Sequence, residues 1–139
     1  MNILFDTNVV LDVMLDRTPF SAPAGHLLSL VEQGEISGLI CATTVTTIHY
    51  LATKIVGKEQ TQNQIRNLMI LFDIAPVNRP VIEYALKSKF SDFEDAVIYQ
   101  SASHAGAEAI VTRDIKGFKK SKLPIYSPTE MLIILDTID

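Results

Sequence analysis

The chain is organised around residues 1–12, MNILFDTNVVLD. Residues 3–5 form a short apolar run, residues 2–5 are predicted to form a buried strand, and Asp6 follows directly. A second apolar segment begins at Val9 and is dense enough for a short helix. An acid between a strand and a helix lies at the carboxyl end of that strand, which is the edge where α/β sheets bind ligands. Asp6 or Asn8 could also act only as a cap of the following helix, so the rest of the chain must distinguish a ligand site from a helix cap.

The rest of the chain alternates between helical patterns and short apolar runs. Strands are predicted at 36–42, 74–77 and 109–111 and around Ile125, and helices at 9–15, 20–33, 44–56, 59–71 and 93–105, from Pro80 and from Pro128. This alternation is typical of a parallel sheet that is covered by helices on both faces, joined by right-handed crossovers.

Several individual positions follow from the same patterns. Thr43 is expected to cap the helix that follows it, and SDFE at 91–94 and SPTE at 127–130 match the capping-box spacing. The helical pattern places Met69 and Phe72 in the core. Asp12 and Asp16 are expected to face solvent.

Composition limits the class of protein. The chain has 139 residues, of which 47% are hydrophobic and 20% charged, so a single globular domain is expected. No apolar run approaches the length of a membrane span, and no basic region precedes the first apolar run as in a signal peptide. Cys41 is the only cysteine, which excludes an internal disulfide and a multi-cysteine zinc site. A cytoplasmic protein is the default expectation.

The net charge of −4 is not typical of a nucleic-acid-binding protein, but the charge is unevenly distributed. Residues 113–122, RDIKGFKKSK, contain five basic residues and one acid. Such a basic segment beside an acidic body suits a phosphate-bearing partner, although short lysine-rich turns also occur as plain solvated loops.

Strand direction brings several acids to the same place. In a parallel sheet the carboxyl ends of the strands and the N-termini of the crossover helices share one edge, so Asp6, Asp92, Asp95 and Asp114 are expected there. Two carboxylates 4 Å apart repel each other by about 4 kcal/mol at an effective dielectric of about 20, and a bound cation relieves this repulsion. Oxygen ligands without a Cys or His cluster favour Mg²⁺ or Mn²⁺, and such ions support phosphoester hydrolysis. Asp92 at a helix start is also explained by the helix dipole alone.

The chain resembles the PIN domain, a family of small metal-dependent ribonucleases that includes the VapC-type toxins. The matching segments are ILFDTNVVLD at 3–12, SDFEDAVIYQSASHAGAEAIVTRD at 91–114 and FKKSKLPIYSPTEML at 118–132, and the elements between them follow the family order. The resemblance therefore spans residues 1–139 as a single PIN-like domain.

This resemblance implies a three-layer α/β/α fold around a parallel sheet of about five strands. It also implies an endoribonuclease that is the toxin of a type II toxin–antitoxin pair, with RNA as substrate, a cognate antitoxin as partner and a homodimer as assembly. Asp6, Asp95 and Asp114 match the family's catalytic and metal-binding acids, and Asn8 and Thr112 match residues that line the pocket. Arg113, Lys116, Lys119 and Lys120 are the candidates for binding RNA phosphates.

One position departs from the family pattern. Thr47 stands where the family usually has a second acid, early in the helix after the second strand. A hydroxyl carries no charge to replace that of a carboxylate, so metal affinity should be weaker. This leaves open an alternative, a catalytically weakened PIN module that binds RNA or a protein partner.

A third hypothesis comes from the same opening stretch. FDTNVV resembles the strand of haloacid dehalogenase-type phosphatases, which end such a strand on a nucleophilic aspartate. That chemistry normally requires an acid two positions after the nucleophile, where this chain has Asn8.

Overall fold

The computed structural model describes residues 1–138 and is built on a sheet of parallel strands. Within the described residues the sheet has five strands in the order β3-β2-β1-β4-β5, every neighbouring pair parallel. The strands are β1 (Asn2–Phe5), β2 (Ser37–Cys41), β3 (Phe72–Ala75), β4 (Ala109–Val111) and β5 (Ile125–Tyr126). The strand order reverses direction between β1 and β4, which makes the carboxyl ends of these two strands the topological switch point of the sheet.

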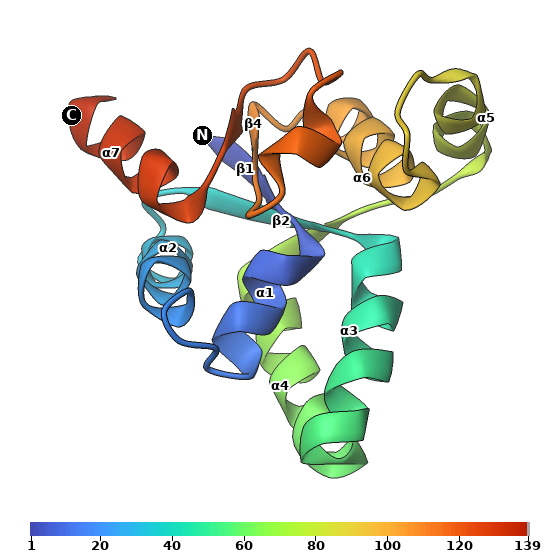
Figure 1. Cartoon of the computed structure of the whole chain (residues 1–139). Coiled ribbons are helices and arrows are strands. Elements are labelled where there is room, and N and C mark those ends of the chain that lie inside the picture. Colours follow the sequence, from blue (N-terminus) through green and yellow to red (C-terminus); the bar gives the residue numbers. More distant parts are fainter. Residues whose placement is uncertain (139) are drawn as a thin grey trace.

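Helices cover both faces of this sheet (Figure 1). One face packs against α1 (Thr7–Met14), α2 (Ser21–Glu32), α3 (Ala42–Val56), α4 (Lys58–Leu71) and α7 (Pro128–Ile138). The other packs against α5 (Arg79–Lys87), α6 (Phe93–His104) and the short 3-10 helix η1 (Ile115–Phe118). The predicted three-layer α/β/α fold with a central parallel sheet is confirmed.

The central strand shows how the two cores form. Ile3 and Phe5 contribute to the core under α1 and α2, whereas Leu4 points to the opposite core under α6. All three side chains are at most 1% exposed. A strand that is buried on both faces reads as a continuous apolar run, which is why residues 3–5 show no alternation with polar residues.

Most helix ends lie within two residues of the sequence expectation. The capping box of α7 is formed as predicted: Ser127 Oγ accepts from the Glu130 backbone N–H at 3.1 Å, and Glu130 accepts from the Ser127 N–H at 2.8 Å. Helix α3 begins one residue before Thr43, and its cap position, Cys41, makes no side-chain capping bond, so the predicted Thr43 cap is wrong. The strand predicted at 74–77 lies two residues earlier.

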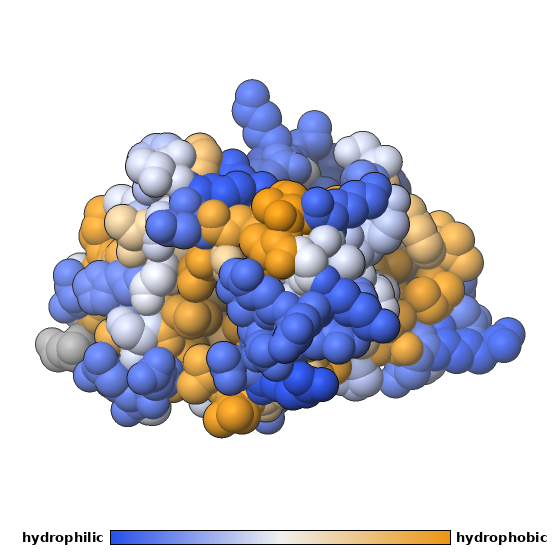
Figure 2. All heavy atoms as spheres, turned by 90° about the horizontal axis from the view of Figure 1, so that it is seen from below, coloured by the Kyte–Doolittle hydropathy of each residue, from blue (hydrophilic) through white to orange (hydrophobic). Residues whose placement is uncertain are grey.

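Helices α3 and α4 form a pair that extends away from the sheet, joined at Gly57 with a φ of 87° (Figure 1). Phe72 is buried as predicted, but Met69 is 42% exposed, so its assignment to the core is wrong. One residue of helix rotates a side chain by about 100°, which carries Met69 out of the contact that buries Leu68. Figure 2 shows the molecule from the side of this hairpin, where hydrophilic side chains gather near the centre of the view and hydrophobic patches lie around them. No helix in residues 1–138 has the length and apolar content needed to cross a bilayer.

Candidate functional site

An acidic cleft of about 440 Å³ lies at the switch point of the sheet. Four carboxylate side chains line it: Asp6, which follows β1, Glu94 and Asp95 in the first turn of α6, and Asp114, which follows β4. Three of the four acids expected at this edge, Asp6, Asp95 and Asp114, are therefore brought to one cleft by strand direction, although they come from distant parts of the chain.

Asp6 is held rigidly at the end of β1. Its side chain is buried, with the residue only 5% exposed, and its Oδ1 accepts a 2.8 Å hydrogen bond from the Thr7 backbone N–H at the start of α1. Oδ2 accepts a second bond of 2.7 Å from the Thr112 hydroxyl. Asp6 thus does cap α1, and it also lines the cleft, so the two interpretations of this residue are compatible.

Thr112 connects the acids of β1 and β4. It is fully buried, and besides donating to Asp6 its Oγ1 accepts from the Asp114 backbone N–H at 2.9 Å. The Asn8 side-chain amide lies 3.5 Å from the same oxygen, and Asn8 Oδ1 accepts from the Arg113 N–H at 3.2 Å. Thr112 and Asn8 therefore fix the loop after β4 against the start of α1.

Asp95 enters the cleft from the first turn of α6. The N-cap of this helix is Asp92, whose Oδ1 accepts from the Asp95 N–H at 2.9 Å, so the predicted capping box of Ser91 and Glu94 is wrong. Asp92 is exposed and does not line the cleft. Glu94, which the capping-box pattern assigned to a helix cap and not to the site, lines the cleft.

The acids perturb one another's protonation. Burial raises the pKa of Asp95 to about 7, with further upward contributions from the charges of Asp6, Asp92, Asp114 and Glu94. Burial also raises the pKa of Asp6, and the charges of Glu94 and Asp114 add to it, while the hydrogen bonds from Thr112 and Thr7 act in the opposite direction. Asp6 and Asp95 are therefore harder to ionise in this cleft than isolated aspartates are.

Donor type and spacing both suit a hard cation. A Cβ placed on Gly117 would lie 2.6 Å from Asp114 Oδ2 and 2.7 Å from Asp95 Oδ2, so these two oxygens approach the same small space. Carboxylate oxygens in such an arrangement are the ligands that Mg²⁺ and Mn²⁺ prefer. Within residues 1–138 no three carboxylate, imidazole or thiolate side chains already stand in a finished ligand set. The residues fit the ion in charge and chemistry, and their side chains would have to close on it.

Thr47 stands on the wall of the same cleft, on the second turn of α3. Its hydroxyl donates to the Thr43 carbonyl at 3.0 Å, within its own helix. The position at which the resemblance implies an acid is neutral here, and the cleft has its negative charge on the sides of β1, β4 and α6.

Two arginines stand at the rim of the cleft and share one buried acid. Asp12 is fully buried; its Oδ1 lies 2.8 Å from Arg17 Nε and its Oδ2 2.6 Å from Arg113 Nε. The expectation that Asp12 faces solvent is wrong, because both guanidinium groups reach into the structure to pair with it. Asp16, by contrast, is exposed as predicted.

The predicted basic residues separate into two groups. Arg113 lines the cleft, whereas Lys116, Lys119 and Lys120 are exposed on η1 and the loop after it, outside the lining of the cleft. Arg17 lines the cleft as well and was not predicted. The sequence signal for Arg17 is its position five residues after Asp12, close enough for the two side chains to pair.

Comparison with known proteins agrees with this geometry. The family model described as PIN domain matches residues 2–116. Ribonuclease VapC1 of Aquifex aeolicus (strain VF5) is 22% identical over 133 residues, which cover 92% of this chain and 91% of that protein.

Solved structures show the same fold. The DNA-bound VapBC structure from Salmonella typhimurium superposes with a TM-score of 0.71 at 14% identity, covering 92% of this chain and 98% of the other. A toxin-antitoxin complex from Klebsiella pneumoniae gives a TM-score of 0.68 at 24% identity, covering 91% and 97%.

Proposed function

This chain belongs to the PIN-domain family, and we propose that it is a metal-dependent endoribonuclease that acts as the toxin of a type II toxin–antitoxin pair. The observation that carries the proposal is the acidic cleft, where Asp6, Asp95 and Asp114 lie together and the pKa values of Asp6 and Asp95 are raised. Membership of this family also removes the haloacid dehalogenase-type alternative.

In this proposal Asp6, Asp95 and Asp114 hold Mg²⁺ or Mn²⁺, with Glu94 as a further acid beside them. When bound, such an ion neutralises charge on a phosphate and makes a water molecule more acidic. Thr112 orients Asp6 and favours its ionised form, because its hydroxyl donates to the carboxylate. Since Asp95 has a pKa of about 7 without metal, it has to lose its proton before it can act as a ligand near neutral pH.

The substrate side of the proposal relies on the basic residues. Arg17 and Arg113 stand at the rim and are kept in place by Asp12, so their guanidinium groups are preorganised for phosphate oxygens. Lys116, Lys119 and Lys120 are exposed nearby on the chain and would add weaker, salt-dependent contacts to the RNA backbone.

Partners follow from the relatives. Several structural neighbours are toxin-antitoxin complexes, which supports a cognate antitoxin as a partner of this protein. A homodimer is proposed only because the resemblance to VapC-type toxins implies it. A toxin that cleaves cellular RNA would act in the cytoplasm. Residues 1–139 are proposed to form one PIN-like domain.

The test is cleavage of a varied RNA panel by the purified protein with Mn²⁺ or Mg²⁺, with EDTA as the metal-free control. We expect cutting that EDTA abolishes and that Asp6→Asn reduces by at least about a hundredfold, on the scale of losing a group that stabilises the transition state. Asp16→Asn is the matched control, because Asp16 is exposed and outside the cleft.

The contradicting outcome would be no cutting with either ion. If the Thr47→Glu variant then cut RNA, the natural protein would be the catalytically weakened PIN module that the neutral Thr47 suggests.

A further inference from the structure

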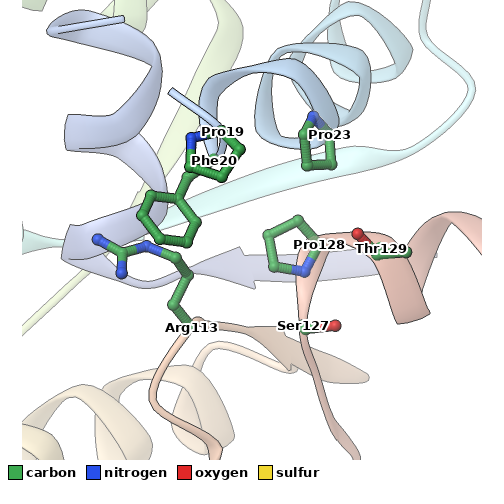
Figure 3. Close-up of a pocket in the computed structure, with 7 residues that line it drawn as sticks. All are labelled: Pro19, Phe20, Pro23, Arg113, Ser127, Pro128 and Thr129. Atoms are coloured by element: carbon green, nitrogen blue, oxygen red, sulfur yellow. The ribbon is translucent and has the colours of Figure 1, made fainter. Parts of the chain in front are cut away.

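A second cleft, of about 460 Å³, lies beside the acidic one and has a different chemistry. Its walls come from the segment that enters α2 and from the start of α7 (Figure 3). They include the rings of Pro19, Phe20, Pro23 and Pro128, with Thr129 and Arg113 as polar members. A space of this size with apolar walls and few polar groups is typical of a small-ligand pocket.

Arg113 belongs to both clefts. Its guanidinium lies over the Phe20 ring, with 3.9 Å from Cζ to the ring centroid, and Asp12 accepts from both its Nε and its Nη2. Because Asp12 is fully buried, it holds the arginine side chain in this position. The two clefts therefore share one cation that Asp12 holds in place.

Phe20 is an exposed aromatic residue on the wall of this cleft. It is 40% exposed although it is large and apolar, and in Figure 3 its ring lies between the Arg113 guanidinium and the open space in front of Pro128. A flat apolar ligand entering this space would meet an aromatic ring, proline rings and a guanidinium plane. Proteins use these groups to stack nucleobases of single-stranded RNA.

We propose that this cleft binds the nucleobase next to the scissile phosphate, stacked against Phe20, while Arg113 contacts the phosphate between the two clefts. The inference rests on the proposed function and adds to it a determinant of sequence preference at one flanking nucleotide. It requires an unpaired base, so the substrate must be single-stranded or locally opened at this position.

The chain contains no tryptophan, which allows a direct binding test. Phe20→Trp keeps an aromatic ring at the cleft and introduces a single indole, and Tyr84→Trp on α5 is the matched control because Tyr84 is 57% exposed on the opposite side of the sheet. The probes are 2′-O-methyl hexanucleotides of each base, with Mg²⁺, and an abasic hexanucleotide that keeps the charge but lacks the bases.

We expect the base-containing probes to quench the fluorescence of Phe20→Trp and not that of Tyr84→Trp. The abasic probe should bind about tenfold more weakly or worse, as expected for the loss of base stacking. In cleavage assays Phe20→Leu, which keeps apolar packing beneath Arg113, should raise KM about tenfold with little change in kcat, and should flatten the preference at the flanking base.

The outcomes separate the inference from the proposed function. If the wild type cuts RNA but the abasic and intact probes behave alike and Phe20→Leu keeps its KM and base preference, the inference is overturned and a protein segment becomes the better occupant. If the wild type cuts no RNA with either metal, the proposed function fails and this inference fails with it.

Discussion

The hydroxyl of Thr112 donates a 2.7 Å hydrogen bond to Oδ2 of Asp6, across 106 residues of sequence. Neither residue has more than 5% of its surface exposed. The bond joins the ends of β1 and β4, the two strands between which the sheet order reverses. It also lowers the pKa of Asp6, against the effect of burial and of the neighbouring acids.

Removing this donor should weaken metal binding without changing the fold. Thr112→Val keeps the shape of the side chain, but Asp6 loses a hydrogen bond that favours its ionised form. We expect the affinity for Mn²⁺ at neutral pH, measured by calorimetry, to fall about tenfold, as for a hydrogen bond to a charged group. Thr112→Ser should restore the Mn²⁺ affinity.

Thr44→Val is the matched control, because it removes a buried hydroxyl that is hydrogen-bonded to Thr7 Oγ1. Equal affinities in Thr112→Val and wild type would contradict the role given to Thr112.

The metal-free protein should lose stability as the pH rises. The pKa of Asp95 is about 7 in the folded chain, against an ordinary value of 3.8, so between these values the folded state binds more protons than the unfolded state. The free energy of unfolding therefore falls as the pH rises from about 4 to 7. The raised pKa of Asp6 acts in the same direction.

Urea unfolding in EDTA, measured at about pH 5 and about pH 8, checks this expectation. Asp95→Asn should show a smaller decrease between the two. Mn²⁺ should recover stability mainly at the higher pH, because it binds the ionised cleft of the folded state. A decrease of the same size in wild type and Asp95→Asn would show that other groups are responsible.

The sequence could predict the sheet and the meeting of the acids, because both depend on strand direction. Once helices and apolar strands alternate, Asp6 and Asp114 have to follow strands on one edge, and Asp95 has to start a helix there. Glu94 was missed because a capping-box pattern accounted for it, and the true cap turned out to be Asp92, one residue after Ser91.

Asp12 could not be assigned in the same way. It lies three residues after the buried Val9, a spacing that puts it on the inward face of α1, but burial of a carboxylate depends on partners that a local pattern does not reveal. Arg113 lies 101 positions away, so only the fold brings the two together.

This ion pair leads to a prediction about stability. Replacing both arginines, as Arg17→Met with Arg113→Met, leaves the fully buried Asp12 carboxylate without its two cations and should cost about 3–5 kcal/mol of unfolding free energy. Asp12→Asn should cost less, about 1–2 kcal/mol, because the two guanidinium groups are partly exposed and can be solvated.

Denaturant unfolding of these variants gives the comparison, with the exposed Asp16→Asn expected within about 0.5 kcal/mol of wild type. If Asp12→Asn lowered the free energy of unfolding more than the double arginine replacement does, the main role of Asp12 would be to stabilise the two arginines, and the prediction would be wrong.

Thr47 leads to a prediction of increased function. Thr47→Glu places a further carboxylate on the wall of the cleft. A charge about 4 Å from an ion attracts it by on the order of 4 kcal/mol at an effective dielectric near 20. Repulsion from the other acids cancels part of this attraction. We expect Mn²⁺ affinity and RNA cutting to rise at least about tenfold. Thr46→Glu is the matched control on the same helix turn, since Thr46 is exposed and does not line the cleft. Equal gains in both variants would mean that added charge, and not its position, is what matters.

Gly117 tests the approach of Asp95 and Asp114 most directly. Its N–H donates to Asp114 Oδ1 at 3.2 Å, and an added Cβ would come within 2.6 Å of Asp114 Oδ2 and 2.7 Å of Asp95 Oδ2. Gly117→Ala should therefore push the two carboxylates off their shared space and weaken Mn²⁺ binding, measured by calorimetry, by about tenfold or more, the scale of a disturbed ligand arrangement.

Gly25→Ala supplies the control for the added methyl group. Gly25 lies within α2, and a Cβ there would meet nothing within 4 Å, so this change should leave metal binding alone and stabilise the helix by about 0.5–1 kcal/mol. If Gly117→Ala bound Mn²⁺ as tightly as Gly25→Ala, the oxygens of Asp95 and Asp114 could not be the pair that meets at the ion, and the ligand set would have to be sought among Asp6, Glu94 and the remaining acids.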